Sequence, residues 1–152
     1  MPFFTTLEEE IVKAEIDNKE IIISFDANSK LGTRLIEKDP NMQSPNGAVL
    51  EGIMSRHALT VVNGLQEKVS GLITRRRSTI NSEEISIIDF VIISDELIQY
   101  LESFTVDESK DYALTKLTKS KNGTQIKESD HNTLISKFNI KWKKSPKREI
   151  QS

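Results

Sequence analysis

The feature that most constrains this chain is the run Ile85–Ser94, the longest apolar stretch in the sequence. Its β-branched residues favour a strand, and its continuous apolar character is typical of a strand inside a sheet. Asp89 interrupts the run, although Ile87 and Val91, which would share its face, are apolar. An ionised carboxylate in such a strand costs free energy unless it is paired or hydrogen-bonded. The sequence therefore predicts a specific partner for Asp89.

A second apolar strand, Ile21–Phe25, leads directly into Asp26 and Asn28. In layered α/β proteins, ligand-binding and catalytic groups collect where strands end. Asp and Asn also close turns well, so turn formation is the alternative interpretation of these two positions. We expect Asp26 to lie at the same edge of the sheet as Asp89.

Helical spacing of apolar residues makes α/β the expected fold class. Phe4–Ile16 predicts a helix that begins near Thr5 or Thr6, with Glu8–Glu10 in its first turn. The simplest interpretation of these glutamates is a solvated face.

A second helix is predicted over Val49–His57, after a loop at residues 33–48, and a strand follows at Leu59–Asn63. His57 falls on the apolar side of this helix, where a structural role is expected. Glu96–Leu101 predicts a further short helix, and Phe104–Asp107 a strand.

A basic strand is predicted at Leu72–Arg77, where three arginines follow Thr74. Because residues of a strand alternate between faces, at most two of the arginines could address one phosphate-bearing surface. The alternative is a solvated edge strand, on which positive charge blocks unwanted pairing. Asn81–Ser82 predicts the turn of a hairpin that joins this strand to the apolar one.

The stretch Glu128–Asn132 contains Asp130 and His131 and precedes a late apolar strand, Leu134–Ile140. Adjacent residues on a strand end or turn point in different directions, so one could face an ion while the other accepts a proton. Upstream, Asn122-Gly123 predicts the turn of a surface hairpin.

Composition limits the class of protein. The 152 residues suit one domain, and 36% hydrophobic with 29% charged residues argues against disorder. A net charge of −2 excludes a basic nucleic-acid coat, and the absence of cysteine excludes thiolate metal sites and a cysteine nucleophile. No apolar run reaches the roughly 18 residues of a membrane span, and no signal peptide is recognisable. We expect an intracellular protein, nuclear or cytoplasmic, without a membrane partner.

Four segments in this order resemble the second half of the endonuclease/exonuclease/phosphatase superfamily, the DNase I-like proteins. They are Asp26-x-Asn28, Thr74-Arg75, Ile88-Asp89-Phe90 with Ser94, and Ser129-Asp130-His131. The similarity is greatest to endonuclease domains of non-LTR retroelements. It implies that residues 1–142 form the C-terminal half of a four-layer sandwich with a mostly antiparallel or mixed sheet. Residues 143–152 would be a basic tail or linker.

The resemblance also implies roles. Asp26 matches the residue that orients or deprotonates the attacking water, and Asn28 the residue that contacts the scissile phosphate. Asp89 matches the partner of the catalytic histidine, His131, which acts as a base or phosphate contact. Asp130 matches an aspartate near the metal.

Thr74 and Arg75 match a pair beside the DNA substrate. A Mg or Mn ion, held by Asp130 and Asp26, would stabilise charge during phosphodiester hydrolysis. Because the site would be incomplete in this chain, we expect little activity from it alone. The alternatives are a non-catalytic nucleic-acid-binding remnant and a phosphatase of the same superfamily.

Two departures from the family pattern stand out. Phe25 replaces the usual glycine before Asp26, which could alter the turn. The family's first half, with its principal metal-binding glutamate, has no counterpart here. An apolar sheet face would therefore be exposed, and we expect a second copy of this chain or the missing N-terminal half to cover it.

Overall fold

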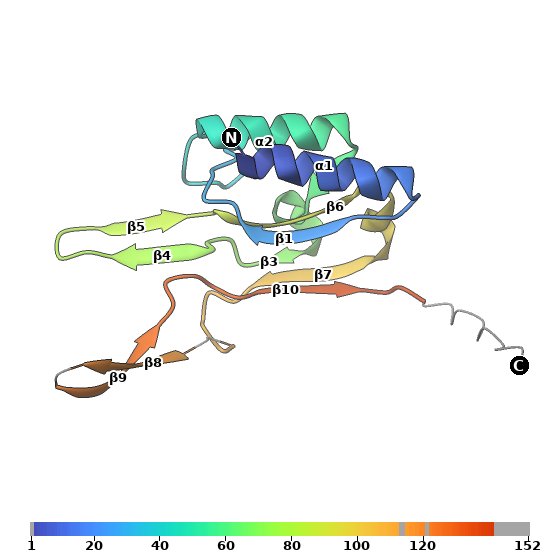
Figure 1. Ribbon diagram of the computed structural model, residues 1–152. Coiled ribbons are helices and arrows are strands. Elements are labelled where there is room, and N and C mark those ends of the chain that lie inside the picture. The colour runs from blue at the N-terminus through green and yellow to red at the C-terminus, as the bar shows by residue number, and fades with distance from the viewer. Residues whose placement is uncertain (1, 113–114, 121, 142–152) are drawn as a thin grey trace, which may run out of the picture.

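Two helices lie side by side on one face of a sheet. The computed structural model describes residues 2–112, 115–120 and 122–141. The helices are α1 (Pro2–Ile16) and α2 (Pro45–Arg56), and Figure 1 shows them above β1. They pack through Phe4 and Ile11 of α1 and through Leu50 and Ile53 of α2. This layer confirms the α/β fold class.

The sheet under the helices has the strand order β1-β6-β2. Its strands are β1 (Ile22–Asp26), β6 (Asp89–Ser94) and β2 (Leu59–Val61), and central β6 is antiparallel to both neighbours. Alternation along β6 sends Phe90 and Ile92 toward the helices. Its other face therefore needs a separate cover.

A second sheet supplies that cover. It has the order β10-β7-β3, made of β10 (Leu134–Phe138), β7 (Leu101–Val106) and β3 (Val69–Ser70). Val91 and Ile93 of β6 pack against Leu101 and Phe104 of β7. Three short 3-10 helices connect the strands: η1 (Val62–Gly64), η2 (Gln66–Lys68) and η3 (Asp95–Tyr100). Helices, first sheet and second sheet thus form three layers (Figure 1).

The expectation of a wholly exposed sheet face is corrected by this arrangement. Ile93 of β6 is fully buried under the second sheet, whereas its cross-strand partner Ile22 on β1 is 50% exposed. Among the described residues, the β1 part of that face is what remains uncovered.

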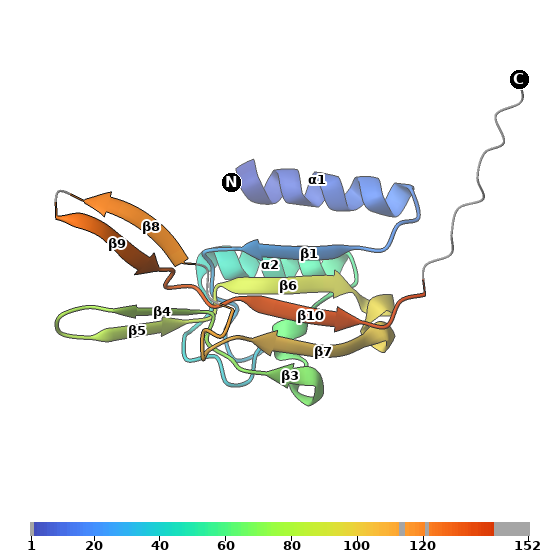
Figure 2. The same ribbon diagram turned by 90° about the horizontal axis from the view of Figure 1, so that it is seen from below.

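Two hairpins project from the molecule at the end where β1 stops. One consists of β4 (Arg75–Ser78) and β5 (Glu83–Ser86), the other of β8 (Thr115–Ser120) and β9 (Gly123–Glu128). Figures 1 and 2 show both on the same side of the sheets. Each forms a two-stranded sheet of its own. The expected basic tail, residues 143–152, lies outside the described residues.

Several boundaries differ from the sequence-based prediction. The run Ile85–Ser94 is two strands, β5 and β6, because the backbone breaks at Ile87 and Ile88, whose side chains are both buried. The strand predicted at Leu72–Arg77 begins only at Arg75. Helix α2 begins at Pro45 because Ser44 caps it, its hydroxyl accepting the N–H of Gly47 at 3.1 Å.

Helix α1 begins at Pro2, so the glutamates expected in its first turn lie in its middle. Glu8 is not simply solvated, because it accepts hydrogen bonds from Arg56 and lies 3.0 Å from Nε2 of His57. Nδ1 of His57 contacts Glu15. His57 therefore joins the two helices. No helix in the described residues is long and apolar enough to cross a membrane.

Candidate active site

The register of the first sheet brings Asp26 and Asp89 together. Asp26 is the last residue of β1 and Asp89 the first of β6, and the two are direct cross-strand partners. Like charges directly opposite one another destabilise an antiparallel pair. A positively charged group or a cation is therefore needed to offset this pair.

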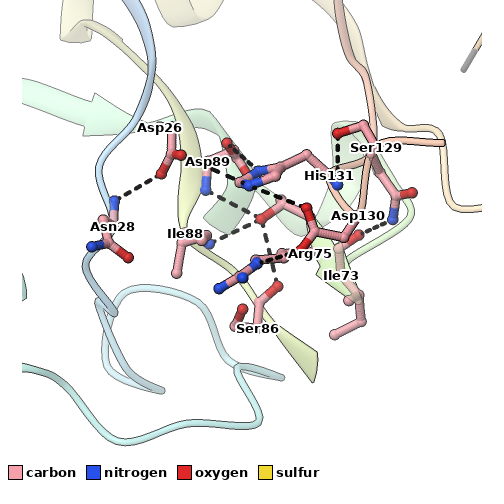
Figure 3. Close-up of polar contacts among 12 residues, drawn as sticks. Asp26, Asn28, Ile73, Arg75, Ser86, Ile88, Asp89, Ser129, Asp130 and His131 are labelled. Atoms are coloured by element: carbon pink, nitrogen blue, oxygen red, sulfur yellow. Dashed lines mark hydrogen bonds and ion pairs between the residues drawn. The ribbon is translucent and has the colours of Figure 1, made fainter. Parts of the chain in front are cut away.

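His131 reaches the two carboxylates from the connection between the hairpins and β10. A bridge between Arg75 and His131 fixes its backbone, and the N–H of Arg76 donates to the Asp130 carbonyl at 2.9 Å. Nδ1 of His131 lies 2.8 Å and 3.1 Å from the two carboxylate oxygens of Asp89 (Figure 3). The partner that the sequence predicts for Asp89 is thus His131.

The second ring nitrogen of His131 points between two further carboxylates. Nε2 lies 3.8 Å from Oδ2 of Asp26 and 3.8 Å from Oδ1 of Asp130. With the Nδ1 proton donated to Asp89, neutral His131 carries an unshared pair on Nε2. That atom can accept a proton from a group placed between Asp26 and Asp130.

Burial governs the electrostatics of Asp89, whose side chain is 13% exposed. Burial raises the pKa of this carboxyl above its ordinary value of 3.8, while hydrogen bonds from His131 and Thr74 oppose the rise. For Asp130, burial would also raise the pKa, but the hydrogen bond and charge of Arg75 hold it below the usual range. The two aspartates beside His131 therefore differ in proton affinity.

Arg75 holds Asp130 in place. Its Nε donates to Oδ2 of Asp130 at 3.0 Å, and its side chain is 29% exposed. Figure 3 shows this contact, and the Arg75 side chain stays partly accessible beside the site.

Asn28 adjoins Asp26 in a tight turn. It has a positive φ of 44°, a conformation that Asn tolerates better than most residues. Its backbone N–H donates to Oδ1 of Asp26 at 2.9 Å. Asp26 and Asn28 therefore form a turn and also lie at the candidate site. Phe25 leaves the register of Asp26 intact, because its ring packs beside Phe3 with centroids 6.0 Å apart.

Thr74 does not lie where a substrate contact is expected. Its residue is fully buried, and its hydroxyl accepts the backbone N–H groups of Ile88 at 2.9 Å and Asp89 at 3.1 Å. These contacts give Thr74 a structural role, and its expected substrate role stays a prediction. Thr74 thus accepts hydrogen bonds from the backbone at the break between β5 and β6. This break turns Asp89 toward His131.

One group of side chains in the described residues is suited to a metal ion. Asp26, Asp89 and His131 each offer a ligand atom, and these atoms lie within 4.8 Å of one another. Two carboxylate oxygens suit Mg²⁺ or Mn²⁺, and the imidazole is better accepted by Mn²⁺. Asp130, expected as a ligand, stands outside this group and is paired with Arg75.

A comparison with solved structures finds the endonuclease domain of TRAS1, a telomere-specific non-LTR retrotransposon. The two agree with a TM-score of 0.59 and 16% sequence identity over 91% of this chain. The chain has part of the DNase I-like fold. It spans 53% of the matched chain, about half of that domain. No family model and no curated protein matches the sequence.

Within this DNase I-like fold, sequence reasoning missed two residues that position the site. Lys110 donates from Nζ to the carbonyls of Ser129, at 2.9 Å, and His131, at 3.4 Å. Asn132 is buried and donates from Nδ2 to the Ile73 carbonyl at 2.7 Å. Lys110 carries no sequence signal, and Asn132 lies in the stretch Glu128–Asn132 but received no role, because both act on backbone atoms distant in the chain.

Proposed function

We propose that this chain contributes to metal-dependent hydrolysis of a phosphodiester bond in DNA. The observation that carries the proposal is the placement of His131 between Asp89, Asp26 and Asp130 at one end of the sheets. A base with a fixed tautomer and nearby carboxylates is what activation of a water molecule requires. The DNase I-like fold of an endonuclease domain supports this class of reaction.

Each side chain has a distinct part. Asp89 orients His131 and stabilises its protonated form. Nε2 of His131 then accepts a proton from a water held between Asp26 and Asp130, or donates one to a phosphate oxygen. Asn28 fixes the Asp26 carboxylate through its backbone N–H and leaves its own amide at the exposed edge. Arg75, still partly exposed, would contact the phosphate.

A divalent cation would be held by the carboxylates of Asp26 and Asp89, because Nε2 of His131 could not bind the ion and also transfer a proton. When bound, Mg²⁺ or Mn²⁺ supplies charge stabilisation for the phosphate oxygens in the transition state. It would also offset the repulsion between the facing carboxylates of Asp26 and Asp89. The donor set therefore fits such an ion.

The other half of the domain is the partner that we propose completes the site. The chain spans about half of the matched endonuclease domain, so low activity is expected from it alone. This same observation favours a second candidate function, binding of nucleic acid without turnover.

Nicking of supercoiled plasmid in the presence of Mg²⁺ or Mn²⁺ tests the proposal. We expect weak nicking that EDTA abolishes and that His131→Ala reduces at least 100-fold, in the range of general acid–base catalysis. The control is His57→Ala, since His57 also contacts carboxylates but joins α1 to α2. Nicking that persists in His131→Ala would rule out the catalytic role. DNA binding without any nicking would favour the second candidate.

A further inference from the structure

The β8–β9 hairpin stands apart from the layered body of the protein. Its strands pair only with each other in the described residues, and Figure 2 shows the hairpin projecting beyond the end of β1. Its second strand ends at Glu128, directly before Ser129, Asp130 and His131. Whatever the hairpin binds is therefore brought close to the candidate active site.

The sequence of this hairpin has a charge opposite to that of the rest of the chain. Residues 115–128 contain four lysines and one glutamate, a formal charge of +3. The whole chain carries −2, so the remaining residues carry −5. Such asymmetry indicates a local surface for a polyanion on an otherwise acidic protein.

The β4–β5 hairpin is a weaker candidate for this role. Arg76 contacts Glu83 and lies 3.9 Å from Glu108, and Arg77 is opposite Glu84 in the ladder. These carboxylates already offset its arginines. In β8–β9, by contrast, the register places Lys116 directly opposite Lys127.

Two lysines directly opposite each other destabilise an antiparallel pair, and an isolated two-stranded hairpin is marginally stable in water. An anionic partner would offset the repulsion between the facing lysines. The hairpin has six-residue strands, a length of about 20 Å. One DNA strand carries a phosphate about every 3.4 Å, so about six phosphates could follow such a hairpin.

We propose that the β8–β9 hairpin is a nucleic-acid-binding arm that holds the phosphate backbone beside the active site. Lys116 and Lys127, which are cross-strand partners and share one face of the hairpin, are assigned to phosphate contacts. The proposal rests on the proposed function for the identity of the polyanion. The arm binds without regard to base sequence and orients the strand that enters between Asp26 and His131.

The test measures binding of the full chain to a fluorescent 20-base-pair duplex in EDTA, between about 50 and 200 mM salt. Replacement of Lys116 and Lys127 by glutamine is expected to lower the slope of log K against log salt by roughly 2. Replacement of the same residues by arginine should keep the slope, which would show that charge rather than local folding is responsible. A matched control, Lys13 and Lys19 to glutamine, makes the same change in net charge elsewhere and should leave the slope unaltered.

An unchanged slope in the glutamine variant of the arm, or an equal fall in the control, overturns the proposal. Phosphatidylserine vesicles test the competing class of polyanion. Tighter binding to vesicles than to the duplex, lost in the same variant, would assign the arm to membranes instead. His131→Ala is expected to reduce nicking at least 100-fold and leave the slope unchanged. Failure of the arm and failure of the catalytic proposal are therefore separate results.

Discussion

At the scale of single residues, the two aspartates beside His131 lie in different environments, and this difference defines the site. Asp89 is largely buried and binds the histidine, and burial raises its pKa. Asp130 is 40% exposed, and Arg75 holds its pKa below the ordinary value against the effect of burial. Both flank one imidazole, so their environments rather than their residue type decide what each can do.

Opposite pH dependences are expected from these two carboxyls. The folded state binds the Asp89 proton more tightly than the unfolded chain does, so this residue reduces stability as pH rises from about 4 through its raised pKa. Asp130 contributes stability above its ordinary pKa, and that contribution is lost as pH falls. Relative to the parent protein, Asp89→Asn should therefore gain stability with rising pH. The gain is about 1.4 kcal/mol for each tenfold difference in the proton affinity of Asp89 between the folded and unfolded states.

Thermal unfolding between pH 3 and 7 in EDTA measures both variants without interference from a bound cation. Asp130→Asn should be less stable than the parent above pH 4 and converge with it in acid. Curves of the same sign for the two variants would show that burial of Asp89 and pairing of Asp130 do not control their protonation.

At the scale of elements, the apolar periodicity predicted the helices and most strands, and it failed where tertiary hydrogen bonds intervene. Nothing within the run Ile85–Ser94 marks the break between β5 and β6. The hydroxyl that accepts the backbone N–H groups at this break belongs to Thr74, outside the run. The pair Ser44-Pro45 is typical both of a turn and of the start of a helix. Only the hydrogen bond from the Gly47 N–H to the Ser44 hydroxyl distinguishes the two. Local signals therefore located the elements, and distant side chains set their ends.

The two glycines of α2 allow the effect of helix propensity on stability to be distinguished from the effect of packing against the rest of the protein. On propensity alone, either one replaced by alanine should stabilise the helix by up to about 1 kcal/mol. A Cβ at Gly52 would meet only a side-chain atom, Nη1 of Arg56 at 3.2 Å, whereas at Gly47 it would lie 1.9 Å from the backbone carbonyl oxygen of Lys30. Gly52→Ala is therefore expected to stabilise the protein, and Gly47→Ala to destabilise it by about 1 to 3 kcal/mol.

Denaturant unfolding of the two variants decides between these effects. A stabilised Gly47→Ala variant would mean that the loop at Lys30 moves away freely. Such movement would also loosen the turn that carries Asp26 and Asn28, since Ser44 links Lys30 to the start of α2.

At the scale of the whole molecule, the order of the segments was enough to predict that Asp26, Asp89 and His131 meet. Asp26 and Asp89 lie at strand ends, and antiparallel pairing of two apolar strands leaves few registers that bury both. His131 lies in the connection that precedes β10. The sequence did not reveal that the chain builds strands of two stacked sheets. That outcome depends on how Val91 and Ile93 are covered, and β7 covers them from a separate part of the chain.

The uncovered part of the first sheet leads to a prediction about assembly. Strands β1 and β10 are at sheet edges, and Ile22 is half exposed on the face whose β6 portion is buried. Burying an isoleucine is worth about 1.5 to 3 kcal/mol. We expect two copies of the chain to associate through this surface, with Ile22 of each contributing to the contact.

Sedimentation velocity over a range of concentrations should show a monomer–dimer equilibrium that Ile22→Lys weakens at least tenfold, because about 1.4 kcal/mol corresponds to a tenfold change in Kd. Ile16→Lys is the control, since Ile16 is 78% exposed on α1, which covers the other face of the sheet. If the parent chain stays monomeric at every concentration, the exposed strand is not a contact between copies.

The other half of an endonuclease domain would then be its remaining partner, because that half is what the matched domain has beyond this chain. Addition of such a half should protect the backbone amides along the free edge of β1, beside Ile22, from hydrogen exchange.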